Sequence, residues 1–247
     1  MLLLEQAIAY FPASVPPDTR VAPPVLVLLH GADRQPPNMI KKFAAEADAR
    51  GIVLLAPSSI NNTWDVVRQA QRVPSRHGSR LDGPAVYRGS RDDARVEAAI
   101  AELGKHVPVD RSKMVLAGFS DGATYALALG MSRDHDFATV IAFSPGLPVP
   151  AAQPASGRTV LVSHGLKDPV LPFDMTCGAI LPELRTQGAR LTFRSFDGVH
   201  QIPQDVITEF FDAAFGPAPG TKPRPITADK SATCKRRNSL PAEIPMP

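Results

Sequence analysis

Five short, largely apolar runs along the chain predict buried β-strands. Each run has four or five residues and is rich in valine, leucine or isoleucine, as expected of strands that are covered on both faces. The runs are Val25–Leu29, Ile52–Ala56, Met114–Ala117, Thr139–Phe143 and Thr159–Ser163. A sixth run, Leu191–Phe196, alternates more and indicates a strand nearer the edge of the sheet.

Helical periodicity fills the intervals between these runs. Ser90–His106 repeats apolar residues on one face and begins with Ser90 and Asp93, the spacing of a capping box. Further helices are predicted over Lys41–Arg50, over Cys177–Gln187 with a kink at Pro182, and over Pro203–Phe215. Strands and helices that alternate along the chain favour a mostly parallel sheet with helices on both faces.

Two regions fit neither period. The stretch 58–89 carries five arginines together with prolines and glycines, and it predicts a long loop that serves as a pocket wall or lid, or else a flexible excursion. Residues 216–247 hold seven prolines and six basic residues against two acidic ones. We expect them to be a disordered, inert tail that follows one folded domain over residues 1–215.

Composition restricts the class of protein. Of the 247 residues, 44% are hydrophobic and 21% charged, which is typical of a globular protein. No apolar run approaches the roughly 20 residues of a membrane helix, and Glu5 interrupts the apolar start too early for a secretory signal. Cys177 and Cys234 cannot build a disulfide framework and lack metal-ligand spacing, which favours a reducing, cytoplasmic setting.

The net charge of +3 does not indicate a nucleic-acid partner. The excess of positive charge lies in the region 216–247, where Lys235–Arg237 supply three consecutive charges. So few charges bind nucleic acid or anionic lipid weakly at physiological salt. The five arginines of 58–89 are interpreted as a solvated face or, less favourably, as an anion site.

The pattern Gly-x-Ser-x-Gly occurs at Gly118–Gly122, directly after a predicted strand and before a helical pattern. A strand, a sharp turn and a helix are the context that a nucleophile elbow requires, whereas the bare pattern is weakly specific. Ser120 is therefore the predicted nucleophile, at the positive end of the following helix. Its alternative reading is an ordinary turn serine.

A base and an orienting acid are expected just after later strands, because ligands bind at the carboxyl ends of parallel strands. Asp168 follows one such strand and His200 follows the next. The order Ser120, Asp168, His200 is the order of a catalytic triad in this architecture. Asp174 and Asp197 compete with Asp168 for the orienting role.

An oxyanion hole needs two backbone N–H groups aimed at the developing negative charge. The residue after the nucleophile, Asp121, is the first predicted donor. Ala32, in the loop after the run Val25–Leu29, is the second, and Gly31 allows the main chain to approach the substrate.

From about Val25 to Phe215 the chain resembles the α/β-hydrolase superfamily, and within it the phospholipase/carboxylesterase branch, which includes acyl-protein thioesterases and small bacterial esterases. The resemblance rests on Leu29–Gly31, Gly118–Gly122, Ala142–Gly146, His164-Gly165-x-x-Asp168 and Gly198-x-His200. It implies an α/β-hydrolase fold with little or no lid, and a serine esterase that uses Ser120, Asp168 and His200 without a cofactor. Thioesterases of this branch usually have glutamine and a glycine pair after the nucleophile. Asp121, Gly122 and Ala123 stand there in this chain, which argues against a lipidated protein as substrate.

Three other residues have competing interpretations. Trp64 is either an aromatic wall of the substrate pocket, as the resemblance implies, or a packing residue. His30 and His164 are expected to shape their loops by bonding nearby backbone, since no carboxylate or thiol cluster accompanies them as a metal site.

These patterns predict a serine carboxylester hydrolase for short-chain acyl or small aromatic esters. The expected partner is a small-molecule ester, and the protein is expected to be a monomer or homodimer that does not insert into membranes. A thioesterase, lysophospholipase or peptidase with the same triad, and transfer of the acyl group to an acceptor other than water, remain open. So does a non-catalytic ligand-binding protein on the same scaffold.

Overall fold

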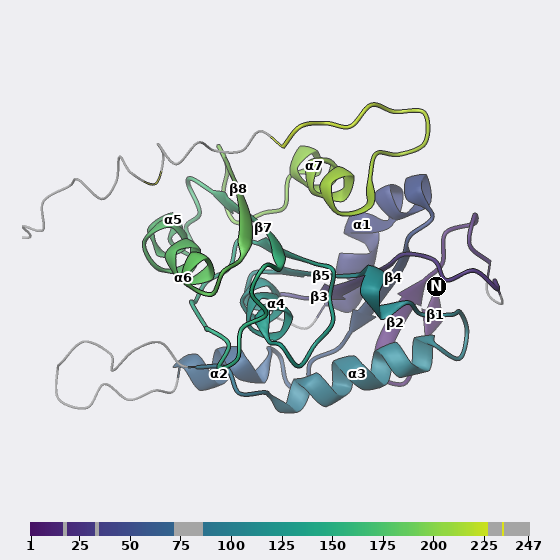
Figure 1. Cartoon of the computed structure of the whole chain (residues 1–247), viewed down its shortest axis with the longest axis horizontal. Helices are drawn as coiled ribbons and strands as arrows, with labels where there is room; N and C mark the ends of the chain where they lie inside the picture. Colours follow the sequence, from purple (N-terminus) through teal and green to yellow (C-terminus); the bar gives the residue numbers. More distant parts are fainter. Residues whose placement is uncertain (17–18, 33–34, 72–85, 227–233, 235–247) are drawn as a thin grey trace, which may run out of the picture.

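The computed structural model describes residues 1–16, 19–32, 35–71, 86–226 and 234. Its centre is an eight-stranded sheet in the order β1-β2-β4-β3-β5-β6-β7-β8 (Figure 1). The strands are β1 (Leu2–Leu3), β2 (Ala7–Tyr10), β3 (Val25–Leu29), β4 (Val53–Pro57), β5 (Met114–Phe119), β6 (Thr139–Phe143), β7 (Thr159–Gly165) and β8 (Arg190–Phe196).

Strands β3 to β8 run parallel, and all six were expected from their apolar runs. Strand β8 forms one edge of the sheet, as its alternating pattern predicted. The N-terminal β1 and β2 add two antiparallel strands beyond β4 that the sequence did not predict. Strand β2 buries only the small side chains of Ala7 and Ala9, which give a weak hydrophobic signal.

Two helical layers enclose the sheet (Figure 1). Helices α1 and α7 share a buried hydrophobic cluster with one face, while α3, α4 and α6 contribute to the cluster on the other. The helices are α1 (Pro36–Arg50), α2 (Asp65–Gln71), α3 (Arg91–Leu103), α4 (Asp121–Met131), α5 (Phe173–Met175), α6 (Leu181–Thr186) and α7 (Gln204–Phe215). A short 3₁₀ turn, Arg111–Lys113, precedes β5. The sheet with helices on both faces confirms the predicted fold class.

Local signals explain several helix ends. Ser90 and Asp93 form the predicted capping box at the start of α3. Gly51 ends α1 with φ 66°, a left-handed conformation that favours glycine. The helix expected over Cys177–Gln187 begins earlier and is interrupted by a π-helical turn, Thr176–Ile180, just before Pro182 in the first turn of α6.

The stretch 58–89 is not a single irregular loop. Helix α2 occupies Asp65–Gln71, and buried Asp92 accepts hydrogen bonds from the backbone N–H groups of Ile60 (2.8 Å) and Asp65 (2.7 Å). Helix α2 is too short to show an apolar repeat in the sequence, and the Asp92 carboxylate holds the backbone at its start. Residues 72–85, with three of the five arginines, lie outside the described residues.

An ion cluster ties α1 to α7. The Arg50 guanidinium pairs with Glu46 and Asp212, and its Nε donates to the carbonyl of Gly216 at 3.1 Å. The chain then continues beside α7, where Ile226 packs against the same hydrophobic cluster. Residues 216–226 are thus attached to the domain, which corrects the expectation that the tail separates from it at residue 216.

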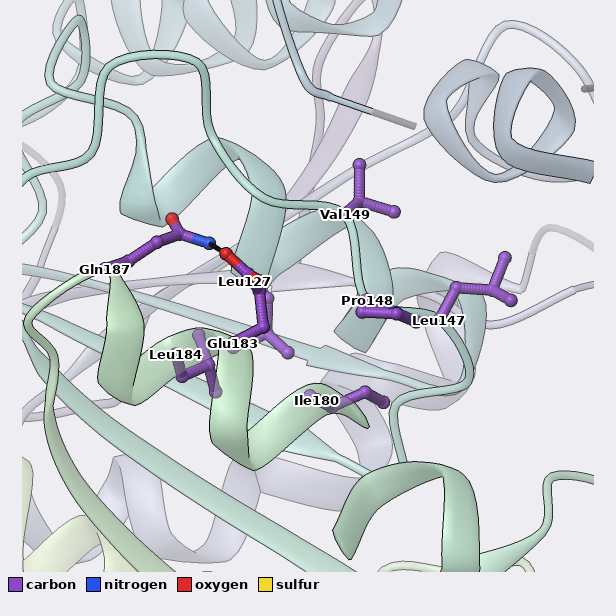
Figure 2. A pocket seen from close by; sticks show the side chains of 8 residues that line it. All are labelled: Leu127, Leu147, Pro148, Val149, Ile180, Glu183, Leu184 and Gln187. Atoms are coloured by element: carbon purple, nitrogen blue, oxygen red, sulfur yellow. Dashed lines mark hydrogen bonds between the residues drawn. The ribbon is translucent and has the colours of Figure 1, made fainter. Parts of the chain in front are cut away.

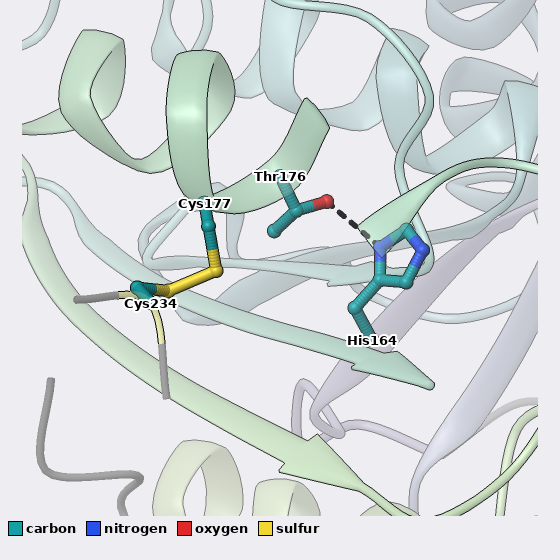
Figure 3. Close-up of a disulfide and its surroundings, with 4 residues drawn as sticks. All are labelled: His164, Thr176, Cys177 and Cys234. Carbon is teal, nitrogen blue, oxygen red and sulfur yellow. Dashed lines mark hydrogen bonds between the residues drawn. A yellow bond between two sulfur atoms is a disulfide. The ribbon is translucent and has the colours of Figure 1, made fainter. Parts of the chain in front are cut away.

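A disulfide joins Cys177 to Cys234, whose Cα atoms are 5.3 Å apart (Figure 3). Two cysteines were expected to build no disulfide framework, and the sequence did not predict this single bond. The sequence separation of 57 residues and the location of Cys234 in a proline-rich region concealed the pairing. Disulfides persist mainly in oxidising compartments, so the bond also removes the argument for a reducing environment.

No helix among the described residues is long and apolar enough to cross a membrane.

We predict that the disulfide stabilises the domain against unfolding. Cys234→Ser removes a cross-link over 57 residues and should lower the free energy of unfolding by about 2–4 kcal/mol, because the unfolded chain regains freedom. Urea denaturation measures this change. Wild-type protein in a thiol reductant is the control and should match the variant, whereas stability that does not respond to reductant would contradict the prediction.

Candidate active site

Ser120 lies at the turn between β5 and α4. Its backbone has φ 57° and ψ −119°, a conformation that residues other than glycine rarely adopt. Its N–H donates to the carbonyl of Phe143 at 2.9 Å, which fixes the turn to the end of β6. A Cβ on Gly118 would lie 2.0 Å from the carbonyl oxygen of Gly122, and one on Gly122 would lie 2.2 Å from that of Leu29. The two glycines are therefore required by the close approach of the backbone segments.

Asp168 and His200 follow β7 and β8, and the structure brings them together. Nδ1 of His200 lies 2.7 Å from Oδ2 of Asp168. Their loops are joined by backbone hydrogen bonds from Leu166 to Phe196 and from Lys167 to Gly198, both 2.9 Å. Strand order thus places the acid and the base side by side.

The Asp168 side chain is fully buried, and both of its carboxylate oxygens accept hydrogen bonds from the protein. Oδ1 accepts from the N–H groups of Val170 and Leu171, both at 2.9 Å. Burial raises the pKa of Asp168, but the hydrogen bonds from Leu171, His200 and Val170 outweigh burial and leave the pKa below its usual value. The group is therefore ionised at neutral pH and can stabilise a protonated His200.

The two competing aspartates have different surroundings. Asp197 forms an exposed ion pair with Lys167 at 2.7 Å, and Asp174 is exposed in α5. Of the three aspartates, Asp168 is the buried one and the one for which a hydrogen bond to His200 is observed.

The oxyanion-hole candidates flank Ser120. Ala32 and Gly31 line the same cavity as Ser120, and a Cβ on Gly31 would lie 3.3 Å from Cβ of Ser120. Asp121 begins α4, where backbone N–H groups have no partner within the helix. The hydroxyl of Thr63 donates to Oδ2 of Asp121 at 2.5 Å, a contact that sequence reasoning missed because Thr63 lies in an irregular segment.

Trp64 packs against the loop of His30 and is not among the residues that line the cavity of Ser120. It is fully buried, stacks on Tyr125, and donates from Nε1 to the carbonyl of His30 at 2.7 Å. His30 in turn accepts from the N–H of Ser59 at 3.1 Å through Nε2. The packing interpretation of Trp64 and the loop-shaping role of His30 therefore agree with the structure.

One cavity of about 390 Å³ opens at this edge of the sheet. It combines Ser120 and His200 with apolar and amide side chains. The lining residues are His30, Gly31, Ala32, Gln35, Asn38, Met39, Phe119, Ser120, Val170 and His200. The cavity therefore unites the predicted nucleophile, base and oxyanion loop, with Asp168 behind His200.

A second pocket, between α4, residues 147–149 and α6, has only about 10 Å³ (Figure 2). That volume holds about one water molecule. Two of its lining residues, Gln187 and Glu183, are joined by a hydrogen bond of 3.0 Å from the Gln187 amide to the Glu183 carboxylate. This pocket is too small for an ester substrate.

Comparison with known proteins identifies the family of this chain. The model of the family described as Phospholipase/Carboxylesterase matches residues 85–212, which include Ser120, Asp168 and His200. The chain belongs to the phospholipase/carboxylesterase family. This confirms the resemblance that the sequence motifs indicated, and the family is one of hydrolases with the α/β-hydrolase fold.

Two relatives of this chain are named as esterases. NocK of Nocardia uniformis subsp. tsuyamanensis, named as an esterase, is 30% identical over 155 residues, 61% of this chain and 42% of its own length. "Probable feruloyl esterase C" of Aspergillus oryzae is 32% identical over 133 residues, 53% of this chain and 42% of its own length. The chain thus matches less than half the length of these two relatives.

Solved structures share the fold. The phospholipase/carboxylesterase of Dyadobacter fermentans DSM 18053 superposes with a TM-score of 0.54 at 20% identity, covering 84% of this chain and 94% of that one. The Bacillus cereus carboxylesterase gives a TM-score of 0.52 at 19% identity over 85% and 94% of the two chains.

We predict that Trp64→Phe destabilises the protein without altering acyl-chain preference. The substitution keeps an aromatic ring beside Tyr125 but removes the donor to the carbonyl of His30, which should cost about 1–3 kcal/mol of unfolding free energy. Thermal denaturation and hydrolysis of an acyl-chain series measure the two effects. A changed chain preference with unchanged stability would instead support a pocket wall.

Proposed function

We propose that the protein hydrolyses short-chain acyl or small aromatic carboxylic esters through Ser120, His200 and Asp168. The observation that carries the proposal is the placement of Ser120, at a strained strand-to-helix turn, in one cavity with a histidine bonded to a buried carboxylate. These are the parts that acyl transfer through a serine nucleophile requires.

The reaction proceeds in two halves. In the first, His200 accepts the hydroxyl proton while the oxygen of Ser120 attacks the ester carbonyl, and the alcohol departs with a proton from His200. In the second, water loses a proton to His200 and attacks the acyl-serine, and the acid product leaves as the proton returns to Ser120. Asp168 holds the imidazole with Nδ1 protonated and stabilises the imidazolium that forms in each half.

The tetrahedral oxyanion binds to the backbone N–H groups of Ala32 and Asp121 in this proposal. The amide of Asp121 belongs to the first turn of α4, where the helix dipole favours negative charge. The Thr63 hydroxyl supports that turn by binding the Asp121 side chain.

Cavity shape supports small substrates. Met39, Phe119 and Val170 offer apolar surface beside Ser120, and about 390 Å³ is near the lower end of ligand pockets. The name of one relative, "Probable feruloyl esterase C", agrees with a small aromatic acyl group. The partner proposed is thus a small ester, for a monomeric or homodimeric protein. The disulfide removes the argument on which the predicted cytoplasmic location rested, so that location is not part of the proposal.

Rates on matched ester, thioester and amide substrates, together with fluorophosphonate labelling, distinguish the competing functions. A thioesterase or peptidase with the same residues would prefer thioester or amide over the matched ester. A non-catalytic binding protein would fail to react with a fluorophosphonate, which requires an activated serine.

We predict that Ser120→Ala lowers the turnover of p-nitrophenyl acetate by several orders of magnitude, because the covalent route is lost. Thermal denaturation should show a folded variant, and fluorophosphonate labelling of the wild-type protein should map to Ser120. Ser112→Ala, an exposed serine outside the cavity, is the matched control and should retain labelling. Near-normal hydrolysis by Ser120→Ala would refute the assignment of the nucleophile.

Acyl-chain preference tests the proposed substrate size. In a series of p-nitrophenyl esters, kcat/KM should be highest for short chains and fall as the chain outgrows the cavity. A maximum beyond about ten carbons would contradict the volume argument.

A further inference from the structure

A second histidine lies against the Asp168 carboxylate and has no part in the steps above. The imidazole of His164, near the end of β7, is fully buried. Its Nε2 lies 2.9 Å from the carbonyl oxygen of Leu171 and 3.3 Å from Oδ2 of Asp168. That same Oδ2 accepts the hydrogen bond from His200.

The surroundings of His164 select one tautomer. Both groups that face Nε2 are acceptors, so Nε2 must carry a proton. On the other side of the ring, Oγ1 of Thr176 lies 2.7 Å from Nδ1. Burial lowers the pKa of His164 and keeps the ring neutral, so the lone pair on Nδ1 accepts a hydrogen bond from the Thr176 hydroxyl.

Thr176 itself is held firmly. It is fully buried at the start of the π-helical turn Thr176–Ile180. The next residue, Cys177, is fixed to Cys234 by the disulfide, and Figure 3 shows the Thr176 hydroxyl pointing at the imidazole of His164. The donor to His164 therefore comes from an anchored segment outside β7.

We propose that Thr176 and His164 are positioning residues for the reaction. Thr176 holds His164 with Nε2 protonated, and the N–H of His164 holds Oδ2 of Asp168 in the place where it binds His200. This inference rests on the proposed function, because it assigns the two residues to the orientation of its acid.

Without the Thr176 hydroxyl, the buried lone pair on Nδ1 would lose its donor, which weakens the preference for a proton on Nε2. With the proton on Nδ1, a lone pair on Nε2 would face two oxygen acceptors, Oδ2 of Asp168 and the carbonyl of Leu171. Repulsion would displace the turn in which Leu171 also donates to Oδ1 of Asp168. Because His164 does not line the cavity, the effect falls on catalysis rather than on substrate binding.

Thr176→Val and Thr176→Ser test the proposal as a matched pair. Valine keeps the branched shape but removes the hydroxyl, and kcat should fall about 10-fold at unchanged KM, the size of effect seen for partners that orient histidines in metal sites. Serine keeps the hydroxyl and should restore kcat. Equal kcat in all three proteins, or equal loss in both variants, would overturn the proposal.

The tautomer can be observed without catalysis. Long-range ¹H–¹⁵N NMR of histidine-labelled wild-type protein, with His164→Gln used to assign the signals, should show His164 protonated at Nε2 and bare at Nδ1. A proton on Nδ1 would overturn the proposal even if a variant failed to fold. If the wild type hydrolysed no ester, the proposed function would fail separately, while a change in esterase kcat confined to Thr176→Val bears on this inference alone.

Discussion

The carboxyl ends of β3, β5 and β7 lie against neighbouring backbone at distances that leave no room for a side chain. A Cβ on Gly122 would meet the carbonyl of Leu29 at 2.2 Å, and one on Gly165 would meet that of Gly198 at 2.5 Å. The first approach places the turn of Ser120 directly against the end of β3, where the loop of Gly31 and Ala32 begins. The second approach, of Gly165 to Gly198, places the loop of Asp168 directly against the loop of His200. The order of the parallel strands brings four loops to one edge of the sheet, and these two backbone contacts are how closely the loops of the candidate site pack.

Hydrogen bonds from the protein, and not water, stabilise the negative charge of Asp168. The buried Asp168 carboxylate would be costly alone, and two backbone N–H groups and His200 compensate for its burial. Support of the same kind extends outward, through Thr63 to Asp121 and through Trp64 to the backbone of His30. Thus Asp121, the backbone of His30 and the imidazole of His200 each have a hydrogen-bond partner in the fold.

The sequence predicted the parts of this structure that rest on local patterns. Six parallel strands, the capping box at Ser90 and the positions of Ser120, Asp168 and His200 all follow from periodicity, turn residues and strand order. It did not predict α2, whose first residue bonds to the distant carboxylate of Asp92, and it does not decide whether Trp64 is a packing residue or a pocket wall. The disulfide and the attachment of residues 216–226 were missed for the same reason, since long-range pairing leaves no periodic signal.

A crystal structure of the protein inhibited by a small fluorophosphonate tests the central claim most directly. The account predicts phosphorus bonded to Oγ of Ser120, one phosphonyl oxygen within hydrogen-bond distance of the N–H groups of Ala32 and Asp121, and His200 still bonded to Asp168. Phosphorus on another side chain, or a phosphonyl oxygen turned away from both N–H groups, would contradict it.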